Sequence, residues 1–432
     1  MIYEELKNRI IKNFKIIGSG KILGGILSAL TLLIIGRFLG VKEFGIFSIV
    51  ISIVEILNII FSLRVWDTSV KFIGENIASK NLASKYLSYS FILSSTSSIF
   101  SYFAILILTL LLPIESLDIS EDIKKFILIY SFAVLFISSN ETIDGILRTF
   151  DRYKEIFKIN VFTNLFRFCL ILFLLLSNSI NISYCLSLYV LTYFFGLLLR
   201  FFILSNVMKN NEIKINFLDL PEKREKINFI KFMLNAHFSN ILNLANDKNL
   251  GVVVVGFIAG PFYAGLYRAA RAIVKIIRRI MDPVLEIVFP ELVKLEAEKD
   301  FKNYKKIIVD STKLVSISSI IIGLTIFIFA PNIISIFFGE QFLDSESALK
   351  ILIFAMIAHN ASYWVNPSML SLGRPDYLSL LTIITTTVYC ISLYFMVEPL
   401  KADGAAASLA IRNLVTLILG TYLCTKVIAN KS

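Results

Sequence analysis

The sequence predicts an all-α integral membrane protein of about twelve transmembrane helices in two pseudo-symmetric six-helix bundles. Hydrophobic residues make up 56% of its 432 residues and the mean hydropathy is +0.75, which is far too apolar for a soluble globular protein. A triplet of glycines with identical spacing also occurs twice, each time between two long apolar runs: Gly36, Gly40, Gly45 and then Gly256, Gly260, Gly265. Such an internal repeat is typical of a membrane bundle duplicated with parallel topology.

The individual spans follow from length and hydropathy. A hydrocarbon core of about 30 Å is crossed by about 20 helical residues. The apolar runs near that length lie at about 16–37, 44–63, 87–112, 124–147, 158–177, 184–206, 232–256, 262–282, 312–330, 347–367, 376–396 and 404–425.

The runs group into domains around a basic segment in the middle of the chain. We expect an N-terminal six-helix bundle over 16–207, a basic cytoplasmic linker over 208–231 and a C-terminal bundle over 232–432. Residues 1–15 have apolar side chains at helical spacing against lysines, which predicts an interfacial helix on the cytoplasmic face. A simple cluster of positive charge explains the same pattern equally well.

Positive charge predicts the orientation. Lysine and arginine gather before the first run and in every even-numbered loop, whereas the odd-numbered loops are neutral or acidic. Because basic loops stay inside, both termini should lie in the cytoplasm, with the protein in the cytoplasmic membrane. This asymmetry accounts for the net charge of +11 and would place the basic loops against anionic membrane lipids, so no nucleic-acid partner is expected.

A stripe of cations marks the eighth run. Its members recur at intervals of three, four and three residues, which places them on one helical face: Arg268, Arg271, Lys275 and Arg278. A charge at the bilayer centre costs at least about 2.5 to 3.5 kcal/mol, so these side chains should face a wet cavity or partners. Arginine forks suit a pyrophosphate. Arg268 and Arg278 could instead extend to the two interfaces, so we place Arg271 and Lys275 in the cavity.

Two further cations are candidates for the same anion. Arg64 lies at the cytoplasmic end of the second run and Lys21 lies early in the first, where either could receive a pyrophosphate or reach the headgroups. Asp247 and Lys248 lie about two-thirds across the seventh run, on or near a polar face. They could pair with each other, or Asp247 with a cation of the eighth run, as a gate or as structural glue.

Carboxylates within spans are candidates for coupling to an H⁺ or Na⁺ gradient, because a carboxylate in low dielectric can titrate near neutral pH. The most plausible are Asp247, Glu55 and Glu141, with Asp144 three residues after Glu141, and the sequence does not choose among them. His359 could relay protons, although a hydrogen-bonded packing role also explains it. No cofactor is expected, and the cysteines show no metal-ligand spacing.

Four stretches carry a family resemblance. They begin at Arg37, Leu147, Asp247 and Met369 and read RFLGVKEFGIFSIVISI, LRTFDRYKEIFKIN, DKNLGVVVVGFIAGPFYAGLYRAARAI and MLSLGRPDYLSL. In order and location they resemble the polysaccharide (O-antigen type) flippase branch of the multidrug/oligosaccharidyl-lipid/polysaccharide exporter superfamily. The resemblance implies a V-shaped alternating-access transporter that carries a polyprenyl-pyrophosphate-linked oligosaccharide to the outer leaflet. Other glycan-assembly proteins would then be candidate partners.

Other classes fit the sequence less well. A cation-coupled multidrug or small-molecule exporter of the same superfamily would favour an acidic, aromatic cavity, and the cationic stripe argues against it. A peptidoglycan-precursor flippase has two further spans. A polytopic glycosyltransferase or ligase usually carries a large soluble domain or long acidic loops, whereas the stretches between these runs are short and basic. We therefore expect no enzymatic activity.

Overall fold

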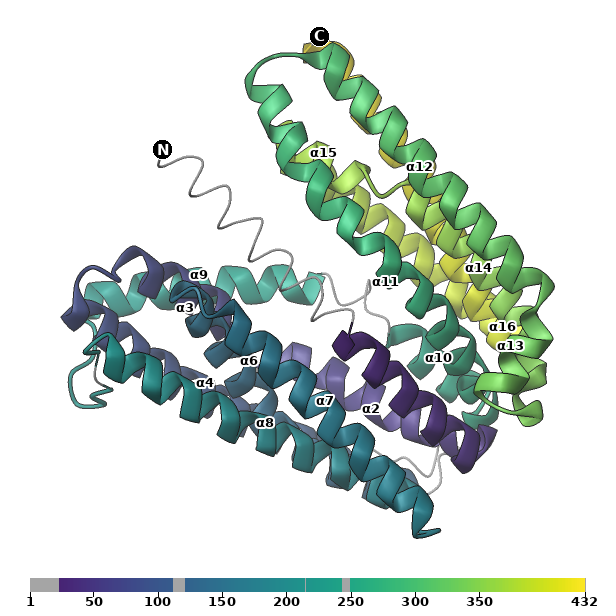
Figure 1. Cartoon of the computed structure of the whole chain (residues 1–432), viewed down its shortest axis with the longest axis horizontal. Coiled ribbons are helices and arrows are strands. Elements are labelled where there is room, and N and C mark those ends of the chain that lie inside the picture. Colours follow the sequence, from purple (N-terminus) through teal and green to yellow (C-terminus); the bar gives the residue numbers. More distant parts are fainter. Residues whose placement is uncertain (1–22, 112–120, 214, 243–248, 432) are drawn as a thin grey trace. The chain divides into compact units, whose positions relative to one another are not determined.

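A computed structural model describes residues 23–111, 121–213, 215–242 and 249–431, which are helical almost throughout and contain no strand (Figure 1). The first described helix is Leu23–Leu39. Those that follow are α2 (Val41–Phe61), α3 (Val65–Glu75), α4 (Lys80–Leu111), α5 (Glu121–Ser131), α6 (Val134–Thr149), α7 (Tyr153–Leu176), α8 (Ile182–Asn210), α9 (Lys223–Leu242), α10 (Leu250–Ile258), α11 (Pro261–Ala297), α12 (Phe301–Ile328), α13 (Ala330–Phe337), the 3₁₀ helix η3 (Glu340–Ser345), α14 (Glu346–Ala361), α15 (Val365–Ser371) and α16 (Pro375–Lys431).

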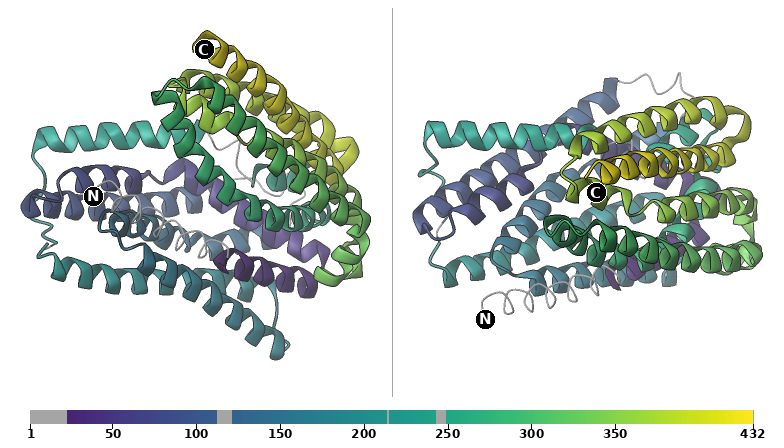
Figure 2. Two further views of the ribbon diagram at one scale, coloured as in Figure 1. Left: turned by 45° about the horizontal axis from the view of Figure 1, so that its top comes forward. Right: turned by 90° about the horizontal axis from the view of Figure 1, so that it is seen from above.

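These helices form two compact units. The first comprises residues 50–244 with the chain before residue 32, and the second comprises Leu32–Ile49 with residues 245–432. In the first unit α6 packs against α3, α4 and α8. In the second unit α14 packs against α11, α12 and α16 (Figures 1 and 2). The domain boundaries expected from the sequence remain a prediction, and the interfacial helix expected over 1–15 lies outside the described residues.

The apolar helices confirm the prediction of an all-α membrane protein. Eight described segments are long and apolar enough to span a bilayer, and the apolar helix Leu23–Leu39 is shorter. The eight are Val41–Phe61, Lys80–Leu111, Asp122–Thr149, Tyr153–Leu176, Ile182–Asn210, Phe301–Ile328, Glu340–Ser371 and Pro375–Lys431.

Helix ends differ from the predicted run ends, because a helix continues past the apolar stretch that hydropathy detects. Helix α11 extends to Ala297, which places Lys294 in a helix and not in the predicted eighth loop. The predicted run 232–256 falls on α9 and α10, with residues 243–248 outside the described chain. Helix α16 turns at Lys401, where φ is 54° and ψ is −122°, and thus contains both of the last two predicted runs.

The repeated glycines adopt matching conformations. Gly40 precedes α2 with φ +81° and Gly260 precedes α11 with φ +92°, a region that residues with a Cβ rarely adopt. One turn further on, a Cβ on Gly45 would lie 1.8 Å from the carbonyl oxygen of Pro261, and one on Gly265 would lie 2.2 Å from a carbonyl oxygen of α2. The two copies of the repeat therefore pack directly on each other, with α2 and α11 in backbone contact.

A buried aromatic cluster holds α9 against α3 in the first unit. The Phe229 ring is fully buried, and its centroid lies 5.1 Å from that of Phe72 and 6.0 Å from that of Tyr86. Apolar burial of this kind stabilises helix packing without directional bonds. This aromatic packing holds the axis of α9 in place, and the C-terminal end of α9 reaches the polar cavity described next.

Candidate functional site

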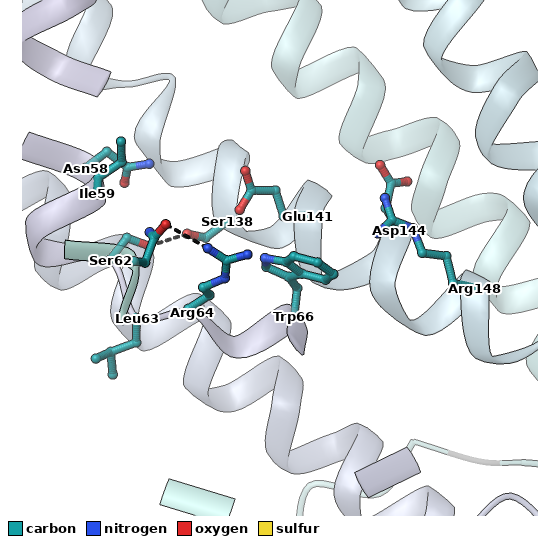
Figure 3. A pocket seen from close by; sticks show the side chains of 11 residues that line it. Asn58, Ile59, Ser62, Leu63, Arg64, Trp66, Ser138, Glu141, Asp144 and Arg148 are labelled. Atoms are coloured by element: carbon teal, nitrogen blue, oxygen red, sulfur yellow. Dashed lines mark hydrogen bonds between the residues drawn. The ribbon is translucent and has the colours of Figure 1, made fainter. Parts of the chain in front are cut away.

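The first unit contains a polar cavity of about 380 Å³ (Figure 3). This volume falls in the range of small-molecule sites, about 300 to 1,000 Å³. Residues of α2, the following turn, α3, α6 and α9 line it: Asn58, Ile59, Ser62, Leu63, Arg64, Trp66, Ser138, Glu141, Asp144, Arg148 and Asn240.

A short turn between α2 and α3 shapes the floor of this cavity. The Ser62 hydroxyl is hydrogen-bonded to that of Ser138 on α6, and the Leu63 N–H donates to Ser97 Oγ of α4 at 2.6 Å. Serines of two neighbouring helices thereby satisfy polar groups that the turn leaves outside helical hydrogen bonding. The turn ends at Arg64, whose side chain enters the cavity.

Two arginines flank the Trp66 indole. The Arg64 guanidinium donates from Nε to the Asp67 carboxylate and from Nη1 to Asn240 Oδ1 at 2.7 Å. Its central carbon lies 5.1 Å from the centroid of the Trp66 ring, and that of Arg148 lies 5.3 Å from the same ring. These are cation–π distances, so the indole and the two guanidinium groups hold one another in place.

Asp144 is held in a buried ion pair. Arg200 of α8 donates to both of its carboxylate oxygens, at 2.8 and 3.0 Å, and donates further to Asn160 Oδ1 at 2.6 Å. The two side chains are only 8% and 15% exposed. A bidentate, hydrogen-bonded pair of this kind satisfies both charges, so Asp144 has little capacity left for a ligand.

Glu141 lies one turn before Asp144 on α6 and is in a different situation. Its side chain is exposed to the cavity, and Figure 3 shows its carboxylate near Arg64 and Trp66. Within the described chain it forms no hydrogen bond and no ion pair. Of the two cavity carboxylates, it is therefore the one that can accept hydrogen bonds from a ligand.

The cavity and its direct ion-pair partners are formally neutral. Three cations face three anions: Arg64, Arg148, Arg200 and Asp67, Asp144, Glu141. The site offers many hydrogen-bonding groups and no net charge.

The family is decided by a match over most of the chain. Residues 10–296 match the family model of polysaccharide biosynthesis proteins. The chain belongs to that family. It is also 27% identical over 177 residues to a putative O-antigen transporter of Shigella flexneri, a stretch that covers 40% of this chain and 41% of that relative's length.

Solved structures identify the fold of this family member. An inward-facing multidrug resistance MATE family transporter of the MOP superfamily superposes with a TM-score of 0.79 at 15% identity, covering 94% of this chain and 95% of that one. A MOP superfamily transporter from Pyrococcus furiosus, described as having a binding pocket of reverse polarity, gives 0.67 at 16%, covering 97% and 96%. At such identities the likeness concerns the fold alone. It confirms the two-bundle architecture predicted from the sequence.

The protein is therefore a multi-pass membrane protein of the polysaccharide biosynthesis family, with a fold similar to that of solved MATE family transporters. The predicted cationic stripe lies in its second unit, on the single continuous helix α11. Arg268 and Arg271 are half-buried and Lys275 is exposed, while the side chain of Arg278 lies outside the description. The guanidinium carbon of Arg271 lies 5.6 Å from the Tyr267 ring centroid.

The structure brings together three of the predicted site residues, Arg64, Glu141 and Asp144, in the first-unit cavity. Glu55 on α2 and His359 on α14 are half-buried and do not line it. Lys21, Asp247 and Lys248 lie outside the described residues. Across the described ranges, no cluster of three or more His, Cys, Asp or Glu side chains is placed to hold a metal.

Arg148, Trp66, Asn240 and Arg200 were missed as site residues. Arg148 directly follows the predicted run 124–147 and so falls in the predicted basic fourth loop, yet it lies in α6, seven residues after Glu141 and on the same face. That spacing was a usable signal. The contact between Arg200 and Asp144 joins positions 56 residues apart and has no local signature in the sequence.

Proposed function

We propose that this transporter is a flippase that moves a polyprenyl-pyrophosphate-linked oligosaccharide from the cytoplasmic to the outer leaflet of the cytoplasmic membrane, for surface polysaccharide synthesis. The supporting observation is the match of residues 10–296 to polysaccharide biosynthesis proteins on a chain with a MOP transporter fold. The partial similarity to a putative O-antigen transporter points to the same substrate class. Both termini would lie in the cytoplasm.

Helix α11 supplies the chemistry for the pyrophosphate. From Arg268 to Lys275 the cations span about 10 Å along one helix at 1.5 Å per residue. A diphosphate that crosses the bilayer loses hydration and needs charge compensation with hydrogen-bond donors. Arg271 and Lys275 would provide both while the polyprenyl tail remains among the lipids, and other glycan-assembly proteins would deliver and collect the substrate.

A cation-coupled exporter of drugs or other small molecules is the second candidate. The MATE transporters share its fold, but at 15% identity that likeness does not extend to the substrate. A cationic drug would favour a site with excess carboxylate, whereas carboxylates and arginines are equal in the first-unit cavity. The flippase is therefore the better-supported function, with an H⁺ or Na⁺ gradient as its energy source.

The test is the leaflet distribution of lipid-linked oligosaccharide in cells with and without this protein, read with a membrane-impermeant probe for outward-facing sugar. We expect cytoplasmic accumulation in its absence and reversal on re-expression. The Arg271→Gln/Lys275→Gln double variant should fail to reverse it. The Lys294→Gln/Lys302→Gln variant removes two exposed cations outside this stripe and should behave as wild type.

All proteins must reach the membrane in equal amounts, measured by immunoblot. An abundant Arg271→Gln/Lys275→Gln protein that restores the distribution would refute the role of α11. A distribution that is the same with and without the wild-type protein would refute the flippase and favour the small-molecule exporter.

A further inference from the structure

We propose that the first-unit cavity is a subsite for a neutral sugar ring of the glycan headgroup, separate from the cationic face of α11. The identity of the physiological ligand rests on the proposed function, but the chemistry of the cavity is argued from its own residues.

Charge argues against a diphosphate in this cavity. Arg64 is already engaged by the Asp67 carboxylate and Asn240, and Arg200 by Asp144. Arg148 has no carboxylate partner within the described chain, but the Glu141 carboxylate lines the same cavity and balances its charge. A diphosphate would have to displace existing ion pairs or approach Glu141, and both are costly in a site of low dielectric.

The hydrogen-bonding groups that remain suit a polyol. Asn58 Oδ1 accepts from Ser101 and Asn240 Oδ1 accepts from Arg64, so both amides keep their NH₂ groups without partners in the described chain. Glu141 contributes a carboxylate acceptor with no partner there. Each sugar hydroxyl both donates and accepts, so two donor groups and a charged acceptor around one neutral cavity match its needs.

Glu141 is the central group in this arrangement. A hydrogen bond to an ionised acceptor is stronger than a hydrogen bond to a neutral one. The Ser62 and Ser138 hydroxyls pair with each other on the adjoining wall and leave Glu141 as the strongest acceptor facing the space. A sugar would therefore depend on Glu141 more than on any other lining group.

Trp66 makes the proposal directly measurable. The chain has two tryptophans, Trp66 in the cavity wall and Trp364 beside α15, so Trp364→Phe protein reports through Trp66 alone. Purified full-length Trp364→Phe protein in lipid nanodiscs would be titrated with glucose, galactose, mannose and N-acetylglucosamine. Sodium pyrophosphate at matched ionic strength would be titrated separately. We expect a saturable change in Trp66 emission with at least one of the sugars and none with pyrophosphate.

Matched variants assign the binding to the cavity. Glu141→Gln should lower the affinity for the sugar at least about tenfold, because the charged acceptor is lost. Glu155→Gln removes a carboxylate that pairs with Arg152 outside the cavity and should leave the titration unchanged. As a readout independent of fluorescence, the same sugar should raise the Tm of wild-type protein and not that of Glu141→Gln protein.

Saturable binding of pyrophosphate without sugar would make the cavity a diphosphate site and overturn the proposal. The proposal would also be overturned if none of the sugars changed either the Trp66 emission or the Tm. These failures are distinct from failure of the flippase. Sugar binding with an unchanged leaflet distribution would refute the proposed function alone, and flipping without sugar binding would refute this inference alone.

Discussion

At the scale of single residues, the fold assigns different tasks to side chains that look alike in the sequence. Glu141 and Asp144 lie three residues apart, and the sequence made both of them coupling candidates. In the structure Asp144 forms an ion pair with Arg200, whereas Glu141 has no partner in the described chain. Sequence reasoning could not separate them, because the difference is a side-chain contact with α8.

The buried pair makes a stability prediction. Replacing Asp144 with Asn leaves the Arg200 charge largely buried without its counter-charge, and breaking such a pair costs about 3 to 5 kcal/mol. We expect a clear fall in the Tm of the detergent-solubilised protein, followed with a thiol-reactive dye. Glu212→Gln is the matched control, because its pair with Lys80 is exposed and screened by solvent, and its Tm should not change. The same Tm for the Asp144→Asn and Glu212→Gln variants would contradict the role assigned to Arg200.

At the scale of helices, the sequence predicts that a helix is present more reliably than where that helix begins and ends. Apolar runs locate most of the spans because the bilayer requires their length, which is a strong local constraint. The turn at Lys401 separates two predicted runs, as expected. The length of α11 was underestimated because Lys294 and its neighbours are compatible with either a loop or an amphipathic helix end.

The crossing of α2 and α11 depends on the absence of a side chain at Gly45. An added Cβ would lie 1.8 Å from the Pro261 carbonyl oxygen, and a helix backbone moves away only at a cost. Gly45→Ala should destabilise the protein by about 1 to 3 kcal/mol, as overpacking does, and lower its Tm. Gly74→Ala in α3 meets only the Thr149 methyl at 3.8 Å and should be neutral or slightly stabilising. A Gly45→Ala protein that melts with wild type would show that the two helices separate readily.

At the scale of the whole molecule, two kinds of polar surface lie in two different units. The second unit carries half-buried arginines on α11, and the first carries a neutral cavity with one carboxylate that lacks a partner in the described chain. The sequence predicted the first of these from a spacing of three, four and three. It could not predict the second, because the cavity is assembled from α2, α3, α6 and α9.

If Glu141 holds the sugar, we expect it to couple sugar binding to protons. The charged groups around it are Arg64 and Asp67 from the turn and α3, Asp144 and Arg148 from α6, and Arg200 from α8. Both aspartates are paired with arginines. Glu141 is thus the carboxylate of this set that has no arginine partner within the described chain, and we expect its charge to change with pH. Protonation replaces the charged acceptor of Glu141 with a weaker, neutral one, so proton and sugar should compete for it.

The competition predicts the direction in which sugar affinity changes with pH. Sugar affinity should fall as pH falls through the titration of Glu141, and by linkage sugar binding should release a proton. Outward movement of sugar with inward movement of protons is the exchange that an inward proton gradient can drive. The measurement is the Trp66 titration over a pH series, together with proton release in weakly buffered solution. Glu141→Gln protein should show weak, pH-independent binding and no release. Affinity in the unsubstituted cavity that does not change with pH would exclude Glu141 as the coupling group and direct the search to Glu55.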